Sequence, residues 1–288
     1  MLPPLIKPVR KYETRTAEQL TRHYLVEKEL ANRMRHAAAP DRSHLYQEVY
    51  DELFRRVPDH PQLLRVHNEE RAQAAVAEKI RYIAHLLRPD LTFLEVGAGD
   101  CRLALEAARR VKQVYAVDVS TEITRGLRTP ANFQLVLSGG TDINLPTGSV
   151  DLAYSYQLME HVHPEDARQQ LSEIYRVLKP GGRYVCFTPN RLNGPHDISR
   201  YFDEVASGFH LKEYTLGELS VIFREVGFRQ CRALSGLRGK AIELPLASVR
   251  IMETLLQHTP HALRSKLAEL PIIRHLLDSA LVGAKPKD

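Results

Sequence analysis

Hydrophobic and polar positions follow a helical spacing over the first part of the chain. Residues 17–34 and 45–57 carry apolar side chains at intervals of three and four, the spacing of an amphipathic helix. Prolines after each segment interrupt the pattern. We therefore expect residues 1–67 to form a helical N-terminal cap.

Short apolar runs alternate with helical patterns over residues 68–235. A helix over 68–87 is expected to lead into this region and to end before Pro89. Strands that alternate with helices predict an α/β fold with a doubly wound, mostly parallel sheet, whose ligand pocket lies at the carboxyl ends of the strands. Strands are expected at 91–96, 114–118, 133–137, 150–155, 183–188 and 228–234, and helices at 101–110, 121–127, 164–178 and 215–226.

The C-terminal region is helical up to a last apolar run. Residues 246–256 and 262–277 have helical spacing, and residues 280–286 resemble a final strand, which would make the sheet seven-stranded. We interpret 236–278 as a helical insertion that covers the active site as a lid, and 279–288 as the last strand and tail. The alternative is a helical tail packed on the back of the sheet.

A glycine-rich turn ends the first apolar run. Gly97 and Gly99 can bring bare backbone against a ligand, and Asp118 follows Gly97 by 21 residues, the distance at which an acid grips a ribose diol. A dinucleotide fingerprint needs a third small residue where this chain has Arg102. A large side chain in the phosphate position argues against NAD or FAD, so a phosphate-free nucleoside is expected.

Five segments in order resemble the motifs of the class I S-adenosylmethionine-dependent methyltransferases. The resemblance extends from about residue 71 to residue 231, and Cys101 stands where the family has a third glycine. It implies S-adenosylmethionine as the methyl donor. The segments are Glu95–Gly99, Asp118, Leu145-Pro146 with Ser149–Ser155, Glu160–Val162 and Arg176–Gly182.

The resemblance also implies how this methyl donor is held. Glu95 would face the ammonium of its methionine part, and Asp118 would hold the ribose. Asp142 could accept from the adenine amino group, although the usual register places the acid at Thr141, and a turn-forming role after Gly139 is an open alternative. The implied cofactor contacts are Glu95, Gly97, Ala98, Gly99, Asp118, Val119, Asp142, Ser155 and Gln157.

Candidate catalytic residues follow the fourth and fifth expected strands. His161 lies where relatives bring donor and acceptor together, and its reference pKa suits a base at neutral pH. A structural histidine that holds the loop is the alternative. His196, Tyr201 and His210 lie in a long polar loop and are further candidates for acceptor contact. Thr215 and Glu218 fit a capping box at the next helix start.

Other chemistries have weaker signals. Glu160, His161 and His163 lack an i, i+4 histidine pair and cysteine partners, so no metal site is expected. Ser155 does not lie in the turn of an esterase nucleophile. The three cysteines are far apart and predict no disulfide framework, which suggests a reducing, cytoplasmic setting.

Composition and charge favour a small-molecule acceptor. The chain is 43% hydrophobic and 26% charged, has no apolar window long enough for a membrane span, and its residues 91–235 carry 16 basic against 17 acidic side chains. A concentrated basic stripe for nucleic acid is absent from the sequence. We expect methylation of a small molecule on oxygen or nitrogen rather than carbon. The alternatives are a nucleic-acid or protein methyltransferase, and a non-catalytic protein of the same fold that binds the cofactor or a partner. The sequence leaves the oligomeric state open.

Overall fold

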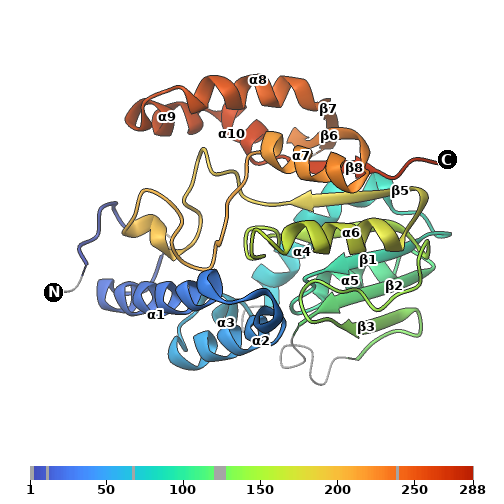
Figure 1. The fold of residues 1–288 in the computed structure, drawn as a ribbon, viewed down its shortest axis with the longest axis horizontal. Helices are drawn as coiled ribbons and strands as arrows, with labels where there is room; N and C mark the ends of the chain where they lie inside the picture. Colours follow the sequence, from blue (N-terminus) through green and yellow to red (C-terminus); the bar gives the residue numbers. More distant parts are fainter. Residues whose placement is uncertain (1–2, 11–12, 67–68, 120–127, 238–239, 288) are drawn as a thin grey trace.

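The computed structural model describes residues 3–10, 13–66, 69–119, 128–237 and 240–287. Over these residues the chain forms one mixed sheet with helices on both faces. A further group of helices lies beyond the carboxyl ends of the parallel strands (Figure 1). The helix expected at 121–127 lies outside the described residues. None of the described helices combines the length and the hydropathy that a bilayer span requires.

The sheet has eight strands in the order β3-β2-β1-β4-β5-β8-β6-β7. The first five strands in this order run parallel, and β8 lies antiparallel between β5 and β6. The prediction that the last apolar run is a sheet strand is thus confirmed. The strands are β1 (Thr92–Val96), β2 (Gln113–Asp118), β3 (Phe133–Leu137), β4 (Val150–Tyr156), β5 (Leu178–Phe187), β6 (Arg229–Leu237), β7 (Lys240–Pro245) and β8 (Ala280–Ala284).

Side chains that alternate along the strands build a separate core on each face. Leu94 and Val96 pack in one cluster with α6 (Ala167–Val177) and α7 (Leu216–Val226). Phe93 points to the opposite face and packs with α4 (Glu69–Ile83) and α5 (Arg102–Ala108). β1 is therefore buried on both faces, as expected of a central strand in a doubly wound sheet. The structure also has two short 3-10 turns, η1 (Ala84–Leu86) and η2 (Ile198–Tyr201).

The expectation of seven strands is wrong by one strand. β7 pairs antiparallel with β6 as the edge of the sheet, within the segment expected to be a helical insertion. Only Ile242 and Leu244 alternate as apolar positions in this short strand, so periodicity gave little signal. Pro245 ends the strand, a position that an edge strand tolerates.

The C-terminal helices pack on the antiparallel side of the sheet. They are α8 (Leu246–Gln257), α9 (His261–Ala268) and α10 (Pro271–Leu277). The single helix expected at 262–277 is divided in two, because Pro271 begins a new helix. Buried Glu253 of α8 accepts from the backbone N–H groups of Leu216 and Gly217, at 2.8 and 2.9 Å, and thereby ties α8 to the start of α7.

The N-terminal cap lies beyond the carboxyl ends of the parallel strands (Figure 1). It consists of α1 (Ala17–His36), α2 (Ala39–Arg56) and α3 (Pro61–Val66), and α1 and α2 share a hydrophobic cluster that includes Phe209. The Arg42 guanidinium donates to both oxygens of Asp166, at 2.8 and 2.6 Å. This buried ion pair fastens α2 to the loop that precedes α6.

Candidate functional site

The glycine turn at the end of β1 has the backbone that the sequence predicts. Gly97 and Gly99 have φ values of 72° and 53°. The N–H groups of Gly97 and Ala98 donate to the carbonyl of Val117, at 2.8 and 3.1 Å, so the turn is fixed to the neighbouring strand. No atom lies within 4 Å of the point where a Cβ on Gly99 would stand, which leaves this backbone open to a ligand.

Asp118 lies at the end of β2 and faces the same turn. Its Oδ2 accepts a 2.7 Å hydrogen bond from the Gly99 N–H. Together with the backbone bonds to Val117, this contact brings the ends of β1 and β2 into one site.

A cavity of about 170 Å³, here called the first cavity, opens at these strand ends. Gly97, Gly99, Asp118 and Val119 form part of its wall. The N-terminal cap supplies another part, through Tyr46, Tyr50, Asp51, Phe54 and Gln62. The remaining lining residues are Val96, Val117, Ser138, Gly140, Gln157, Leu158, His161, Val162 and Gln170.

Glu95, which precedes the glycine turn, is a buried carboxyl with one oxygen that makes no hydrogen bond. It is 5% exposed, and its Oε2 has no hydrogen-bond partner. Burial raises the pKa of Glu95 to about 8, although the positive charge of Lys79 opposes the shift. A buried carboxyl with an open oxygen beside the glycine turn suits an ammonium group of a ligand.

The structure separates the other predicted cofactor contacts into two groups. Gln157 and Val119 line the first cavity, and Gln157 has a φ of 52° and donates from its backbone to the Phe187 carbonyl. Glu95, Ala98, Asp142 and Ser155 are not among its lining residues. The Asp142 carboxylate accepts from Gly139 N at 2.7 Å, the arrangement of a turn-forming aspartate, and Ser155 Oγ contacts the buried Tyr184 hydroxyl at 2.7 Å.

A second cavity, of about 290 Å³, adjoins the first. The two share the lining residues Tyr50, Gln62, Gln157 and His161. The second cavity lies between the N-terminal cap and the loop that follows β5, and its walls are rich in charged and imidazole groups. Its other lining residues are Arg10, Glu13, Arg15, His23, Glu27, Leu53, His60, Pro61, His196, Asp197, Ile198, Arg200, Tyr201, Phe209 and His210.

All four candidate catalytic residues line the second cavity, and His161 lines both. His161 Nδ1 lies 3.0 Å from the Phe209 carbonyl and donates to it, which leaves Nε2 with a lone pair. Burial, and the nearby charge of His210, lower the pKa of His161 to about 3. His161 is therefore a neutral imidazole at the junction of the two cavities.

The pKa of His210 is shifted in the opposite direction from that of His161. Its Nδ1 lies 2.7 Å from the Glu213 carboxylate. Burial alone would lower the pKa of His210, but the hydrogen bond to Glu213 and the charge of Glu160 raise it to about 9. Its ring meets the His161 ring edge-on, with centroids 4.9 Å apart.

His196 and Tyr201 are held by other groups. His196 Nε2 contacts the Asn190 carbonyl and the Asn193 side chain, at 3.2 and 2.9 Å, and burial lowers its pKa. Tyr201 is buried in a small hydrophobic cluster. Both side chains therefore have a structural role beside their place in the cavity wall.

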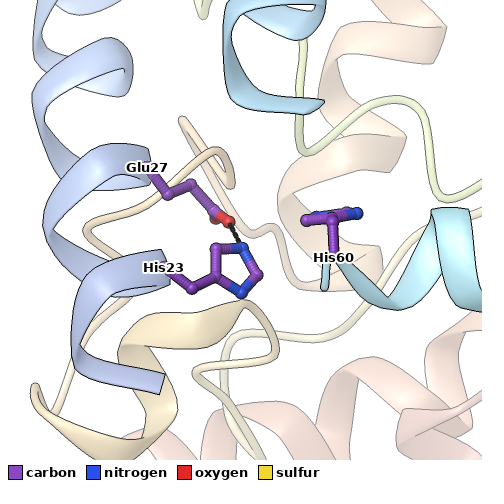
Figure 2. A group of neighbouring side chains, drawn as sticks. All are labelled: His23, Glu27 and His60. Atoms are coloured by element: carbon purple, nitrogen blue, oxygen red, sulfur yellow. Dashed lines mark hydrogen bonds and ion pairs between the residues drawn. The ribbon is translucent and has the colours of Figure 1, made fainter. Parts of the chain in front are cut away.

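Several residues of this site had no functional role in the sequence analysis. Glu160 is entirely buried, its Oε2 accepts from the Thr188 hydroxyl at 2.9 Å, and burial raises its pKa to about 7. His23 and Glu27 of α1 meet His60 from the segment before α3 (Figure 2). The spacing of four between His23 and Glu27 places them on one helix face and could have been noticed. No pattern in the sequence predicts that His60 lies close to these two residues.

Comparisons with known proteins agree with this geometry. A family model described as a methyltransferase domain matches residues 94–186. A Mycolicibacterium smegmatis protein named a probable S-adenosylmethionine-dependent methyltransferase is 36% identical over 136 residues, which cover 47% of this chain and 51% of that protein. The ubiquinone/menaquinone biosynthesis C-methyltransferase UbiE of Brucella abortus is 27% identical, over 43% of this chain and 49% of its own length. The chain spans about half the length of these relatives.

A solved structure extends the likeness of the fold. It is a chain of the complex between the Haloferax volcanii Trm112 methyltransferase activator and a methyltransferase, with a TM-score of 0.52 and 18% identity. The match covers 75% of this chain and 94% of that chain. Residues 94–186 thus match a methyltransferase domain, and the sheet order and the glycine turn with Asp118 agree with the fold of the class I S-adenosylmethionine-dependent methyltransferases.

Proposed function

We propose that this protein transfers a methyl group from S-adenosylmethionine to a small molecule bound in the second cavity. The observation that carries the proposal is the junction of two cavities at His161 and Gln157. The first lies at the glycine turn, where the family binds its methyl donor, and the second is closed over by the N-terminal cap. Adjoining sites of this kind hold the methyl donor and the acceptor side by side. Methyl transfer is a direct displacement at the methyl carbon, and alignment of the two reactants is the main contribution that it requires from the protein.

Residues in the wall of the first cavity, and buried Glu95 beside it in the sequence, fit the donor. Glu95 offers an unpartnered buried oxygen for an ammonium group, the backbone of Gly99 is open, and Asp118 is positioned for a ribose diol. S-adenosylmethionine supplies an activated methyl group on its sulfonium. The protein then has to align the acceptor and exclude water.

The size and setting of the second cavity favour a small acceptor. A volume of about 290 Å³ is at the lower end of small-molecule sites. The N-terminal cap and the loop after β5 form its walls, so a nucleic acid or a folded protein would have to displace these segments. Arg15, itself paired with Glu13, and the neighbouring Arg10 and Arg200 indicate a polar acceptor.

Transfer to a neutral hydroxyl or amine forms the new bond to carbon, breaks the bond to sulfur and releases a proton. Glu160 and His161 are the groups to which we assign the uptake of this proton, because the raised pKa of His210, about 9, leaves that imidazole already protonated at neutral pH. His161 is the member that lines both cavities. Transfer to oxygen or nitrogen is the first candidate. Transfer to carbon is the second, because the Brucella relative is named a C-methyltransferase.

The test combines binding with product analysis. S-adenosylhomocysteine binding is measured by calorimetry, and labelled S-adenosylmethionine is incubated with fractionated small-molecule extracts, with product structures assigned by mass spectrometry and NMR. Wild-type protein should bind the cofactor product and label a small molecule. Arg15→Ala, which alters only the second cavity, should retain cofactor affinity and lose labelling.

The other function classes give different results. Cofactor binding without transfer to any small-molecule fraction would favour a non-catalytic protein. Labelling of RNA or DNA, with acceptor affinity that falls steeply with salt, would favour a nucleic-acid substrate. The position of the label on carbon, oxygen or nitrogen distinguishes the two transfer candidates.

A further inference from the structure

Three side chains at the junction of the two cavities have open ligand atoms that face one another. One atom from each of Glu160, His161 and His210 lies within 4.8 Å of the corresponding atoms of the other two. His161 Nε2 lies 4.0 Å from Glu160 Oε1. The three come from the segment after β4 and from the loop before α7, about 50 positions apart in the sequence.

The outer atoms of both imidazoles are already engaged. His161 Nδ1 is bonded to the Phe209 carbonyl at 3.0 Å, and His210 Nδ1 to the Glu213 carboxylate at 2.7 Å. A metal-bound histidine characteristically directs its second nitrogen to a carbonyl or a carboxylate, which fixes the ring. Both histidines therefore have the outer contacts of metal ligands, with Nε2 left for the centre of the group.

Glu160 provides an independent observation that points to a ligand. Its side chain is entirely buried, and Oε1 has no hydrogen-bond partner, whereas Oε2 is held by Thr188. Leaving a buried carboxylate oxygen unpaired is costly, and a cation removes that cost. Oε1 is the atom that lies near His161 Nε2.

We propose that Glu160, His161 and His210 form a binding site for a divalent transition metal, with Zn²⁺ as the best-matched ion. Two imidazoles and one carboxylate are a donor set that this ion accepts. Tetrahedral bonds of about 2.1 Å separate ligand atoms by roughly 3.4 Å, so the 4.0 Å separation closes by a few tenths of an ångström on binding. His161 and His210 line the second cavity, which leaves access for the ion and an open coordination position.

The other three-residue group lacks these features. In the cluster of His23, Glu27 and His60 (Figure 2), His23 Nε2 is hydrogen-bonded to Glu27 at 2.7 Å. Arg15 Nη1, which can only donate, lies 2.7 Å from His23 Nδ1. His23 therefore directs its proton at Glu27, and both of its nitrogens are engaged. This group provides the matched control.

The experiment uses untagged protein of residues 1–288, stripped of metal with a chelator. Calorimetric titration with Zn²⁺ should give one site per chain, and titration with Co²⁺ should give the visible absorption of a low-coordinate nitrogen and oxygen site. Glu160→Gln, which can keep the Thr188 contact, should weaken Zn²⁺ binding by about a hundredfold or more. His60→Ala should leave the affinity unchanged.

Two results would overturn the metal site: wild-type protein that binds neither ion, or Zn²⁺ affinity that survives Glu160→Gln and is lost in His60→Ala. The metal site is argued from geometry and stands whether or not the protein transfers methyl groups. A metal on His161 Nε2 would occupy the lone pair assigned above to the released proton, so S-adenosylhomocysteine binding and labelling are measured on the metal-free protein before each titration. Turnover without metal binding rejects the metal site alone, and metal binding without turnover rejects the proposed function alone.

Discussion

The backbone N–H of Gly99 donates a 2.7 Å hydrogen bond to the Asp118 carboxylate, and this contact joins the ends of β1 and β2. It gives Asp118 two roles, since the same side chain lines the first cavity. Replacement of Asp118 therefore alters the glycine turn as well as any ligand contact, and the two effects have to be separated by the choice of variant.

Asp118→Ala should weaken S-adenosylhomocysteine binding at least tenfold. A hydrogen bond to a charged group contributes about 1.5 to 3 kcal/mol, which corresponds to roughly a ten- to hundredfold change in affinity. Isothermal titration calorimetry measures the effect. Asp118→Asn is the control, because its amide oxygen can still accept from Gly99. If both variants bind as tightly as wild type, Asp118 does not hold the ribose.

Glu95 should make cofactor binding depend on pH. Its folded-state pKa is raised to about 8 by burial, so at pH 5.5 the carboxyl is protonated and has to lose its proton to pair with an ammonium. Affinity for S-adenosylhomocysteine should therefore rise by up to roughly seventyfold between pH 5.5 and 7.5, because the ionised fraction of a carboxyl with a pKa of about 8 rises by about that factor over these two pH units.

Glu95→Gln should bind S-adenosylhomocysteine weakly, with little dependence on pH.

The free energy of unfolding of the unliganded protein should change with pH in the direction opposite to the binding affinity. Since the folded pKa lies above the ordinary value of 4.5, ionisation of Glu95 opposes folding increasingly as the pH rises from 4.5 to 8. Thermal unfolding at pH 5 and pH 8 checks this second expectation. A wild-type affinity that is flat across this range would count against an ammonium partner for Glu95.

Local patterns predicted the parallel half of the sheet and its glycine site. Strands buried on both faces leave an apolar run that can be recognised in isolation, and Gly97 to Asp118 lie within one β-α-β unit whose geometry is general. Thr215 and Glu218 form the predicted capping box, with bonds of 3.0 and 2.8 Å. Each of these features depends on residues close together in sequence.

The parts of the site that the sequence did not predict depend on docking between distant segments. Tyr50 enters the first cavity from α2 because the N-terminal cap packs over the strand ends, and no local pattern specifies that contact. His210 reaches Glu160 only because the loop before α7 returns to the end of β4. The expectation of no metal site rested on spacing along the chain, and such spacing does not test the metal site proposed above, whose residues come from separate loops.

The N-terminal cap should control access to the cofactor site through Arg42. Its guanidinium is 2% exposed and bidentate to Asp166, and Tyr46 donates to the same carboxylate at 3.0 Å. Arg42→Ala leaves Asp166 with a buried charge and should destabilise the fold by about 3 to 5 kcal/mol. Cofactor affinity should fall as well, since Tyr46 and Tyr50 line the first cavity.

Arg56→Ala is the matched control in the same helix. Arg56 pairs with Glu29 at the surface, at 2.8 Å, and its loss should cost at most about 1 kcal/mol and leave cofactor affinity unchanged. Chemical denaturation and calorimetry report the two quantities. Equal effects of the two variants would mean that the clamp to Asp166 does not hold the N-terminal cap in place.

Glu253 provides a test of whether 236–278 acts as a lid. None of the described residues of this segment lines the first or the second cavity. Glu253 accepts from Leu216 N, Gly217 N and the Asn190 side chain, at 2.8, 2.9 and 2.7 Å, so it joins α8 to the core and not to the cavities. Glu253→Ala leaves these donors without a partner and should lower the free energy of unfolding by about 3 kcal/mol.

The same variant should bind S-adenosylhomocysteine with wild-type affinity at a temperature where it stays folded. Glu253→Gln, which keeps an acceptor oxygen, should restore part of the lost stability. The structure thus predicts that damage to the 236–278 segment affects stability and spares binding, whereas damage to the Arg42 clamp affects both. A large loss of cofactor or acceptor affinity in folded Glu253→Ala would instead return the role of lid to 236–278, because stability alone does not connect α8 to the cavities.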